Sequence, residues 1–459
     1  MAQGQTIDVS ALIDGRKMNG FNARVVIICF FVVFFDGYDI GTISFAGPAL
    51  LKSWHLTSMA QMGAVFSASL FAILFGGPLF GWVGDRFGRK AAIIGSCLTI
   101  AVFSLLTMGA TNVTELIILR FLTGLGIGGL PPNTLAINGE FAPKRVRATM
   151  MIIMFTGITL GGGVPGPVAN ALMPTYGWQV LFLIGGLTPI IMAIIVARWL
   201  PESIKYLVVR GKQAEAVRVI RGLAPQLTVP ADANFVVSDE RVYRRFTPDL
   251  LFRDGLKWIT PLLWILFICN LMCFYFVNTW LPTILVTAHI PMSHAAWAAT
   301  LFQIGGTVGG LVLAWPMDRM GLLPVSILFV VAIPIACLIG YASQVNETLL
   351  MIDVSLAGFT LLGLQFGLNA TSAMIYPTSF RSNGSGWAFA VGRCGAVLGP
   401  VVAGVLIGMH MSIQNLYLTL AVPLGIGTVC AFILTRLYYV RFQGMGLGQR
   451  DTLEGSAAE

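Results

Sequence analysis

The stretch "GWVGDRFGRK", residues 81–90, is the most informative part of the sequence about the fold. It sets one acidic and three basic residues among three glycines, and it stands between two long apolar runs. A second stretch, "AWPMDRMG" at residues 314–321, has the same setting. Three positions recur 233 residues later: Asp85, Arg86 and Gly88 correspond to Asp318, Arg319 and Gly321. This correspondence predicts an internal repeat.

The composition is that of a membrane protein. Of the 459 residues, 56% are hydrophobic and only 10% are charged, whereas a soluble protein carries about 25% charged residues. The mean hydropathy is +0.82. A helix needs about 20 apolar residues to cross a bilayer, and the apolar runs are continuous, unlike the alternating strands of a membrane β-barrel. We expect twelve spans, at about residues 25–50, 58–83, 90–108, 114–138, 148–172, 178–199, 258–286, 295–316, 322–343, 348–375, 384–409 and 413–437.

The placement of positive charge predicts the orientation in the membrane. With both termini in the cytoplasm, 25 of the 28 Lys and Arg residues fall in cytoplasmic segments, as the positive-inside rule requires. Lys52 is then external, and Arg120 and Arg393 are left inside spans. The net charge of +8 therefore reflects topology, and it gives no indication of nucleic-acid binding.

A second pair of motifs extends the repeat to whole halves of the chain. "EFAPKRVR" follows the fourth span and "MIYPTSFR" the tenth, and Pro143 and Arg147 correspond to Pro377 and Arg381 at an offset of 234. Such repeats are typical of transporters whose site lies between two halves. We expect these parts: a cytoplasmic segment 1–24, six-helix bundles 25–200 and 258–437, a cytoplasmic loop 201–257 with short helices and a break at Gly211, and a cytoplasmic tail 438–459.

The motif at 81–90 closely resembles the signature loop of the major facilitator superfamily. The resemblance covers the chain from the first span to the last, and it implies an all-α membrane fold of twelve helices in two six-helix bundles. It also implies that this loop latches one conformation on the cytoplasmic side, with its glycines allowing close approach of the second and eleventh spans. The gating residues expected on this basis are Gly81, Asp85, Arg86, Gly88, Arg89, Glu140, Arg147, Asp318, Arg319 and Arg381.

Within that superfamily, several motifs resemble the aromatic acid/proton symporters. They are "DGYD" in the first span, "RFLTGLGIGGLPPN" in the fourth, "YGWQVLFLIGG", "LPES", "WLPT" and "GWAFAVGRCGAVLGP". The resemblance implies import of an aromatic or related organic acid with protons, across a bacterial inner membrane, by a protein that we expect to be monomeric. "GGGVPGP" at 161–167 partly resembles a motif of proton-coupled antiporters, so an exporter of organic anions or drugs is the alternative.

Two carboxylates inside the first span are the candidates for proton coupling. Asp36 and Asp39 lie in "FVVFFDGYDIGTISF", where a charge costs roughly 2.5–3.5 kcal/mol at the bilayer centre. Counting 1.5 Å per residue puts Asp39 and Arg120 at similar depth, so we expect an ion pair. One aspartate would then carry the proton while the other holds the arginine. The sequence leaves the assignment open, with Asp36 favoured as carrier because Asp39 is nearer Arg120 in depth.

Arg393, in the eleventh span, is the candidate for binding a carboxylate, because its planar fork suits that group. The alternative is a structural role, paired with Asp353 or capping backbone. Neutral polar and aromatic residues could contact a substituted ring, although each is more often a packing residue: Tyr38, Asn270, Tyr275, Gln303, Gln365 and Asn369.

Other functional classes have weaker support. No nucleophile and base set, metal-ligand cluster or nucleotide-binding loop is visible, so we expect neither an enzyme nor a cofactor, with the proton as coupling ion. All seven cysteines fall in predicted spans, and we expect buried, inert thiols. A transporter-shaped sensor would carry a long effector tail, and the segment after Arg441 is short.

Overall fold

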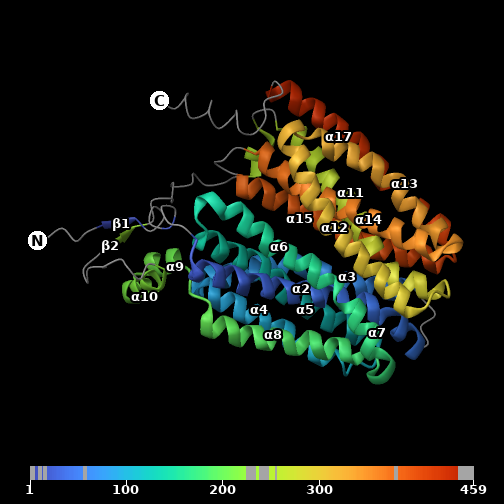
Figure 1. The fold of residues 1–459 in the computed structure, drawn as a ribbon, viewed down its shortest axis with the longest axis horizontal. Coiled ribbons are helices and arrows are strands. Elements are labelled where there is room, and N and C mark those ends of the chain that lie inside the picture. The colour runs from blue at the N-terminus through green and yellow to red at the C-terminus, as the bar shows by residue number, and fades with distance from the viewer. Residues whose placement is uncertain are drawn as a thin grey trace, which may run out of the picture. The chain divides into compact units, whose positions relative to one another are not determined.

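The structure is a computed structural model that describes residues 6–8, 13, 18–54, 59–223, 234–236, 248–253, 256–376 and 381–442 (Figure 1). Twelve helices in this described part are long and apolar enough to span a membrane, as the sequence predicts.

The first six spans contain seven helices, because the fifth span is broken. Val164 separates its two pieces within "GGGVPGP", where Pro165 and Pro167 lack the N–H that would continue the hydrogen-bond ladder. The helices are α2 (Gly20–Ser53), α3 (Met59–Phe87), α4 (Arg89–Thr107), α5 (Val113–Phe141), α6 (Arg147–Gly163), α7 (Pro165–Tyr176) and α8 (Gln179–Trp199).

The last six spans also contain seven helices, with the break in the twelfth. They are α11 (Ile259–Thr287), α12 (Met292–Met320), α13 (Leu323–Val345), α14 (Glu347–Ile375), α15 (Arg381–Gly408), α16 (Ile413–Leu418) and α17 (Ala421–Phe442).

Short elements complete the described chain. Between the halves, α9 (Ile204–Val209) and α10 (Gln213–Leu223) are separated at Gly211, whose φ of 68° ends the first helix as expected. Two 3-10 turns, η1 (Lys144–Val146) and η2 (Pro248–Phe252), lie near the ends of spans. Among the residues that the structure describes, the one departure from helical structure is a parallel pair of three-residue strands, β1 (Thr6–Asp8) and β2 (Asn234–Val236). The sequence gives no warning of it, because pairing of such distant short segments is decided by tertiary contact.

The chain forms two compact units, whose bounds differ from those of the expected six-span bundles. Unit 1 comprises residues 1–40, 72–162 and 179–243, and unit 2 comprises 41–71, 163–178 and 244–459. The bundle boundaries at 200 and 258 stay a prediction.

Within unit 2, parts of α2, α3 and α7 pack against the C-terminal helices. The Ser67 hydroxyl donates to the Val397 carbonyl at 2.8 Å, and the Thr300 hydroxyl donates to the Gly163 carbonyl at 2.9 Å. Gly63 and Gly404 allow α3 to approach α15: a Cβ at Gly63 would lie 2.8 Å from the Pro400 carbonyl oxygen. Backbone contact of this kind holds helices together in membranes, where apolar burial alone does not.

The sequence repeat has a structural counterpart in each unit. In unit 1 a Cβ at Gly161 of α6 would lie 1.8 Å from the carbonyl oxygen of Phe34 on α2. In unit 2 a Cβ at Gly395 of α15 would lie 2.1 Å from the carbonyl oxygen of Ile268 on α11. Gly395 stands 234 positions after Gly161, and Ile268 stands 234 positions after Phe34. The two halves therefore use the same glycine contacts to set equivalent helices side by side.

Candidate transport sites

A buried ion pair lies at the centre of unit 1. Arg120 Nη1, on α5, donates to Asp39 Oδ2, on α2, at 3.1 Å, and both side chains are at most 1% exposed. Ser104, on α4, donates its hydroxyl to Asp39 Oδ1 at 2.5 Å and accepts from Arg120 Nη2 at 3.1 Å. Three helices are thus joined by one charge-assisted network.

Two further contacts hold the guanidinium in place. Arg120 Nη2 donates to the Thr123 hydroxyl at 3.0 Å, and the Arg120 Cζ lies 4.9 Å from the centre of the Phe182 ring of α8. A cation over an aromatic face is attracted by the ring quadrupole. The ion pair expected from depth along the first and fourth spans is therefore present. Its role in proton coupling stays a prediction.

Asp36 and Tyr38, on either side of Gly37, point to different neighbours. Asp36 is 2% exposed and lies within electrostatic range of the Cys97 thiol of α4. Tyr38 packs beside Gly185 and donates its hydroxyl to the Leu181 carbonyl of α8 at 3.3 Å. The structure therefore gives Tyr38 packing contacts with α8, whereas Asp36 lies one helical turn from the ion pair.

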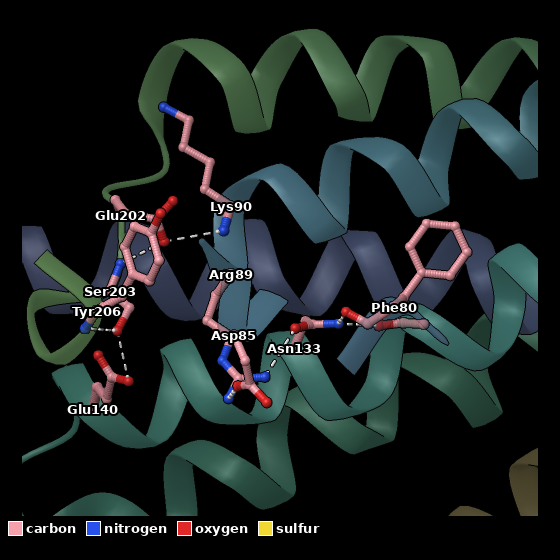
Figure 2. Close-up of polar contacts among 10 residues, drawn as sticks. Phe80, Asp85, Arg89, Lys90, Asn133, Glu140, Glu202, Ser203 and Tyr206 are labelled. Carbon is pink, nitrogen blue, oxygen red and sulfur yellow. Dashed lines mark hydrogen bonds and ion pairs between the residues drawn. The ribbon is translucent and has the colours of Figure 1, made fainter. Parts of the chain in front are cut away.

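The signature motif is mostly helical, which corrects its reading as a loop. Helix α3 continues to Phe87 and α4 begins at Arg89, so Gly88 alone joins them. Arg89 donates to Asp85 at 2.5 Å and to the Asn133 side-chain oxygen at 3.2 Å, and Figure 2 shows it directed at both. Asn133 in turn donates to the Phe80 carbonyl at 3.2 Å. Arg89 thus connects the motif to α5.

Gly88 is required where it stands for two reasons. Its φ is 107°, which side chains rarely adopt, and a Cβ there would lie 2.2 Å from Glu202 Oε2. Glu202, in the segment after α8, accepts the Lys90 N–H at 3.2 Å and the Ser203 N–H at 2.8 Å (Figure 2). Its carboxylate thus satisfies backbone donors at the start of α4, where the helix dipole also favours negative charge.

Burial raises the pKa of the Glu202 carboxyl above its ordinary value of 4.5, and the backbone N–H donors partly oppose that shift. A second carboxylate lies nearby: Glu140 of α5 accepts from the Ser203 hydroxyl at 2.8 Å. The segment after α8 is therefore bonded to both α4 and α5 through neighbouring residues.

The remaining gating candidates contribute less in this structure. A Cβ at Gly81 would meet nothing within 4 Å in this structure, and the expected approach of the second and eleventh spans at this glycine stays a prediction. Arg86 is exposed, and its carbonyl accepts from Tyr206 and Arg210 at 3.3 and 3.1 Å. Arg147 donates to the Ala142 carbonyl at 3.1 Å, and Arg319 lies 4.2 Å from the centre of the Trp315 ring. The side chains of Asp318 and Arg381 lie outside the described residues.

A row of amides crosses unit 2 between α11 and α14. Asn270 Nδ2 donates to Gln365 Oε1 at 3.0 Å, and Gln365 Nε2 donates to Asn369 Oδ1 at 3.2 Å. Asn270 Oδ1 is buried and has no hydrogen-bond partner among the described residues. This oxygen can accept a hydrogen bond from a ligand. Three of the predicted substrate residues are thereby brought together.

Gln303 and Tyr275 form separate contacts. Gln303 Nε2 of α12 donates to Asn278 Oδ1 of α11 at 2.9 Å. Tyr275 is 8% exposed, and its ring lies 4.8 Å from that of Phe274 in an edge-to-face arrangement, a common packing geometry for aromatic residues.

Arg393 of α15 is half-buried and has no acidic side chain within ion-pair distance in the described part of the chain. The alternative pair with Asp353 is thus not formed. Its Cζ lies 5.6 Å from the centre of the Phe389 ring. The guanidinium therefore has an aromatic neighbour and retains capacity for an anion.

Several contributors carried no sequence signal. Ser104, Thr123 and Phe182 complete the ion-pair network, but hydroxyl and phenyl groups are common in apolar helices and nothing in their spacing distinguishes them. Glu202 is different, since an acidic residue just outside a span, in "LPES", could have been paired with the exposed start of α4. Among the cysteines, Cys394 is exposed and Cys337 is only partly buried, which corrects the expectation that all seven are buried.

Comparison with known proteins agrees with this architecture. The family model described as "Major Facilitator Superfamily" matches residues 29–293 and 263–441. The chain is also similar in fold to the xylose transporter XylE from E. coli, solved in a partially occluded inward-open conformation. The TM-score is 0.66 at 16% identity, covering 92% of this chain and 98% of that one.

Curated relatives match over nearly their whole length. The 4-hydroxybenzoate transporter PcaK of Pseudomonas putida is 35% identical, over 93% of this chain and 95% of its own. The gallate transporter of Pseudomonas putida is 34% identical, over 91% and 92%. The benzoate transport protein of Acinetobacter baylyi is 30% identical, over 94% of each. With twelve spans, the family match and these relatives together, the chain belongs to the Major Facilitator Superfamily of multi-pass inner-membrane transporters and is not an enzyme.

Proposed function

We propose that the protein imports an aromatic carboxylic acid together with protons, by alternating access, with both termini in the cytoplasm. The relatives at 30–35% identity are named for 4-hydroxybenzoate, gallate and benzoate, which are all aromatic carboxylates. The observation that best supports this function is the buried pair of Arg120 and Asp39 with Asp36 on the same helix. Proton and acid are the partners, and no cofactor is needed.

The proton site is assigned to Asp36. Asp39 pairs with Arg120 and accepts from the Ser104 hydroxyl, so a negative charge on it has partners. Asp36 lies three residues away in a buried position. A second negative charge there would be repelled by the first and would lack water. Protonation removes both costs, and movement of the helices that admits water would lower the cost of the charged form and let the proton leave.

The substrate site is assigned to unit 2. Arg393 has no acidic partner within ion-pair distance among the described residues, and its fork matches a carboxylate. The amides of Asn270, Gln365 and Asn369 offer donors and an unused acceptor at Asn270 Oδ1. A ring hydroxyl, as in 4-hydroxybenzoate, could donate to that oxygen. Aromatic residues such as Phe389 and Tyr275 suit an aromatic ring.

The contacts around the signature motif would stabilise one of two conformations. Arg89, Glu202 and Glu140 tie α4, α5 and the segment after α8 into one body. A rigid body of this kind can rock as a unit, which alternating access requires. Asp85 is 69% exposed beside Arg89, so its charge is available for contacts made in another conformation. Asp85→Asn should then slow turnover while leaving substrate binding unchanged.

Proton-coupled export is the second candidate, supported by the helix break at Val164 between α6 and α7. Reconstitution separates the two. Vesicles energised with an acidic outside and an alkaline inside should accumulate benzoate-type acids if the protein is a symporter, with benzamide as an uncharged control. An exporter in the same orientation would instead expel preloaded acid under that gradient.

A further inference from the structure

A second buried carboxyl group lies in unit 2, away from the sites assigned above. Asp353, on α14, is 6% exposed, and its Oδ2 has no hydrogen-bond partner among the described residues. Its carboxylate lies within electrostatic range of the Tyr417 hydroxyl, on α16, and of the Cys337 thiol, on α13. The Tyr417 hydroxyl is also buried without a hydrogen-bond partner in that part of the chain. The Asp353 carboxyl group and the Tyr417 hydroxyl are therefore two buried polar groups that lie within electrostatic range of each other, each with an atom that lacks a hydrogen-bond partner among the described residues.

This cluster occupies the repeat position of the ion pair in unit 1. Asn112 and Asn346 cap α5 and α14 in the same way, each accepting from a backbone N–H of its own helix. Arg120 follows the first cap by eight residues, and Asp353 follows the second by seven. Both groups therefore lie about 10 Å along their helices, at 1.5 Å per residue. Asp353 is the counterpart of Arg120 to within one residue.

The neighbours correspond as well. The equivalent glycine contacts make Ile268 the counterpart of Phe34, and five residues further along each helix stand Asp39 and Cys273. Gly88 and Gly321, both with positive φ, precede α4 and α13. Sixteen residues after each comes Ser104 or Cys337. The site that holds an arginine, an aspartate and a serine in unit 1 holds an aspartate and two thiols in unit 2.

The change leaves Asp353 without a cation. No nitrogen of Lys, Arg or His lies within ion-pair distance of it in the described residues. The helices packed against α14 are α11, α12, α13 and α15. The Cys337 thiol of α13 and the Tyr417 phenol of α16 lie within electrostatic range of Asp353, and the Cys273 thiol of α11 lies within that range of Cys337. The charged groups on these helices are engaged or distant: His294 of α12 pairs with Glu347, and Arg393 makes no ion pair with Asp353.

A lone carboxylate in such surroundings is costly. A buried charge without a partner costs several kcal/mol in effective terms, and thiols and phenols do not compensate it. A neutral carboxylic acid avoids that cost. Its O–H can also donate a hydrogen bond to a hydroxyl oxygen such as that of Tyr417. Apolar residues would fill the position more stably, so the carboxyl group requires another explanation.

We propose that Asp353 is a second proton-binding site of this protein. Its carboxylate takes a proton from hydronium while water reaches it, which releases a water molecule and forms the acid. The acid stays protonated while the cluster is closed and returns the proton to water when the helices part. Its participation in transport rests on the proton coupling proposed above, but its proton binding does not.

Labelling of the wild-type protein tests the proton directly. The carbodiimide dicyclohexylcarbodiimide reacts with protonated carboxyl groups in apolar surroundings. The full-length protein in detergent is treated over a pH series, digested, and the fraction modified at each aspartate is measured by mass spectrometry. Asp353 should be modified, with the fraction falling as pH rises, while Asp39 should remain unmodified throughout. No modification of Asp353 at any pH, or modification independent of pH, would overturn the proposal.

A variant separates this site from the transport proposal. Asp353→Asn imitates the protonated acid, and Tyr417→Phe is a matched control that keeps the carboxyl group. Exchange of labelled substrate across proteoliposomes should persist in Asp353→Asn, but the pH dependence of net uptake should be weaker than in wild type, because only the proton site at Asp36 remains. If labelling gives the predicted pattern and uptake is unaltered, Asp353 binds a proton that is not coupled to transport, which contradicts its role in the cycle. Absence of any transport by wild type would refute the proposed function and leave the labelling result standing.

Discussion

Arg120 and Asp39 approach to 3.1 Å from helices α5 and α2, and neither is more than 1% exposed. Removing one partner would leave the other charge buried. Arg120→Gln should therefore lower the free energy of unfolding by about 3–5 kcal/mol, the usual cost of breaking a buried pair. Thermal unfolding in detergent measures this loss.

The matched comparison is the double variant Asp39→Asn with Arg120→Gln, in which neither charge remains. It should be more stable than Arg120→Gln alone, because no buried charge is left without a partner. If the double variant loses as much free energy of unfolding as the two single variants together, the interaction between Asp39 and Arg120 contributes little to stability.

Arg393→Lys tests whether the guanidinium binds the substrate carboxylate. Lysine keeps the charge but loses the bidentate fork, so the affinity for benzoate should fall by about 1.5–3 kcal/mol, the range for a hydrogen bond to a charged group. Arg319→Lys, at an exposed arginine on Trp315, is the control and should bind normally. Isothermal titration measures both. If benzamide binds wild type as tightly as benzoate, the substrate is not recognised as an anion.

Gly88→Ala and Gly81→Ala form a second matched pair, seven residues apart in one motif. At Gly88 the backbone is in a region nearly exclusive to glycine, which costs other residues about 1–3 kcal/mol, and the added methyl would meet Glu202. At Gly81 the methyl meets nothing within 4 Å, and alanine favours helix. Thermal unfolding should therefore show a loss for the first change only. Equal stability of both variants would contradict the role of Gly88.

The sequence predicted the twelve spans and the Arg120–Asp39 pair because apolar length and depth along a helix are local quantities. It did not identify Gly63, where α3 approaches α15 within unit 2, because the motif lies in another part of α3. The bonds of Glu202 to α4 and of Asn270 to Gln365 join residues 112 and 95 positions apart. Such contacts depend on how helices are rotated about their axes, which composition does not determine.

Glu202 should make stability depend on pH. The pKa of Glu202 is 4.5 in the unfolded chain, and burial raises it in the folded protein. At a pH between the unfolded and the folded pKa, the folded state therefore binds more protons than the unfolded state. Stability is therefore highest below 4.5 and falls as pH rises towards the folded pKa. Glu202→Gln should flatten that decline, because glutamine keeps an acceptor for the Lys90 N–H and does not ionise. Thermal midpoints measured across this range check it, and superimposable profiles would contradict it.

In the proposed cycle an aromatic acid and a proton cross the membrane together, and Asp36 carries the proton. Proteoliposomes containing a trapped pH indicator measure this most directly, on addition of 4-hydroxybenzoate at a pH where the acid is ionised, with protein-free vesicles as the blank. Addition of the substrate should acidify the interior in wild type but not in Asp36→Asn, although that variant should still exchange labelled substrate. Uptake of labelled 4-hydroxybenzoate by wild type without proton entry, or undiminished proton entry in Asp36→Asn, would contradict it.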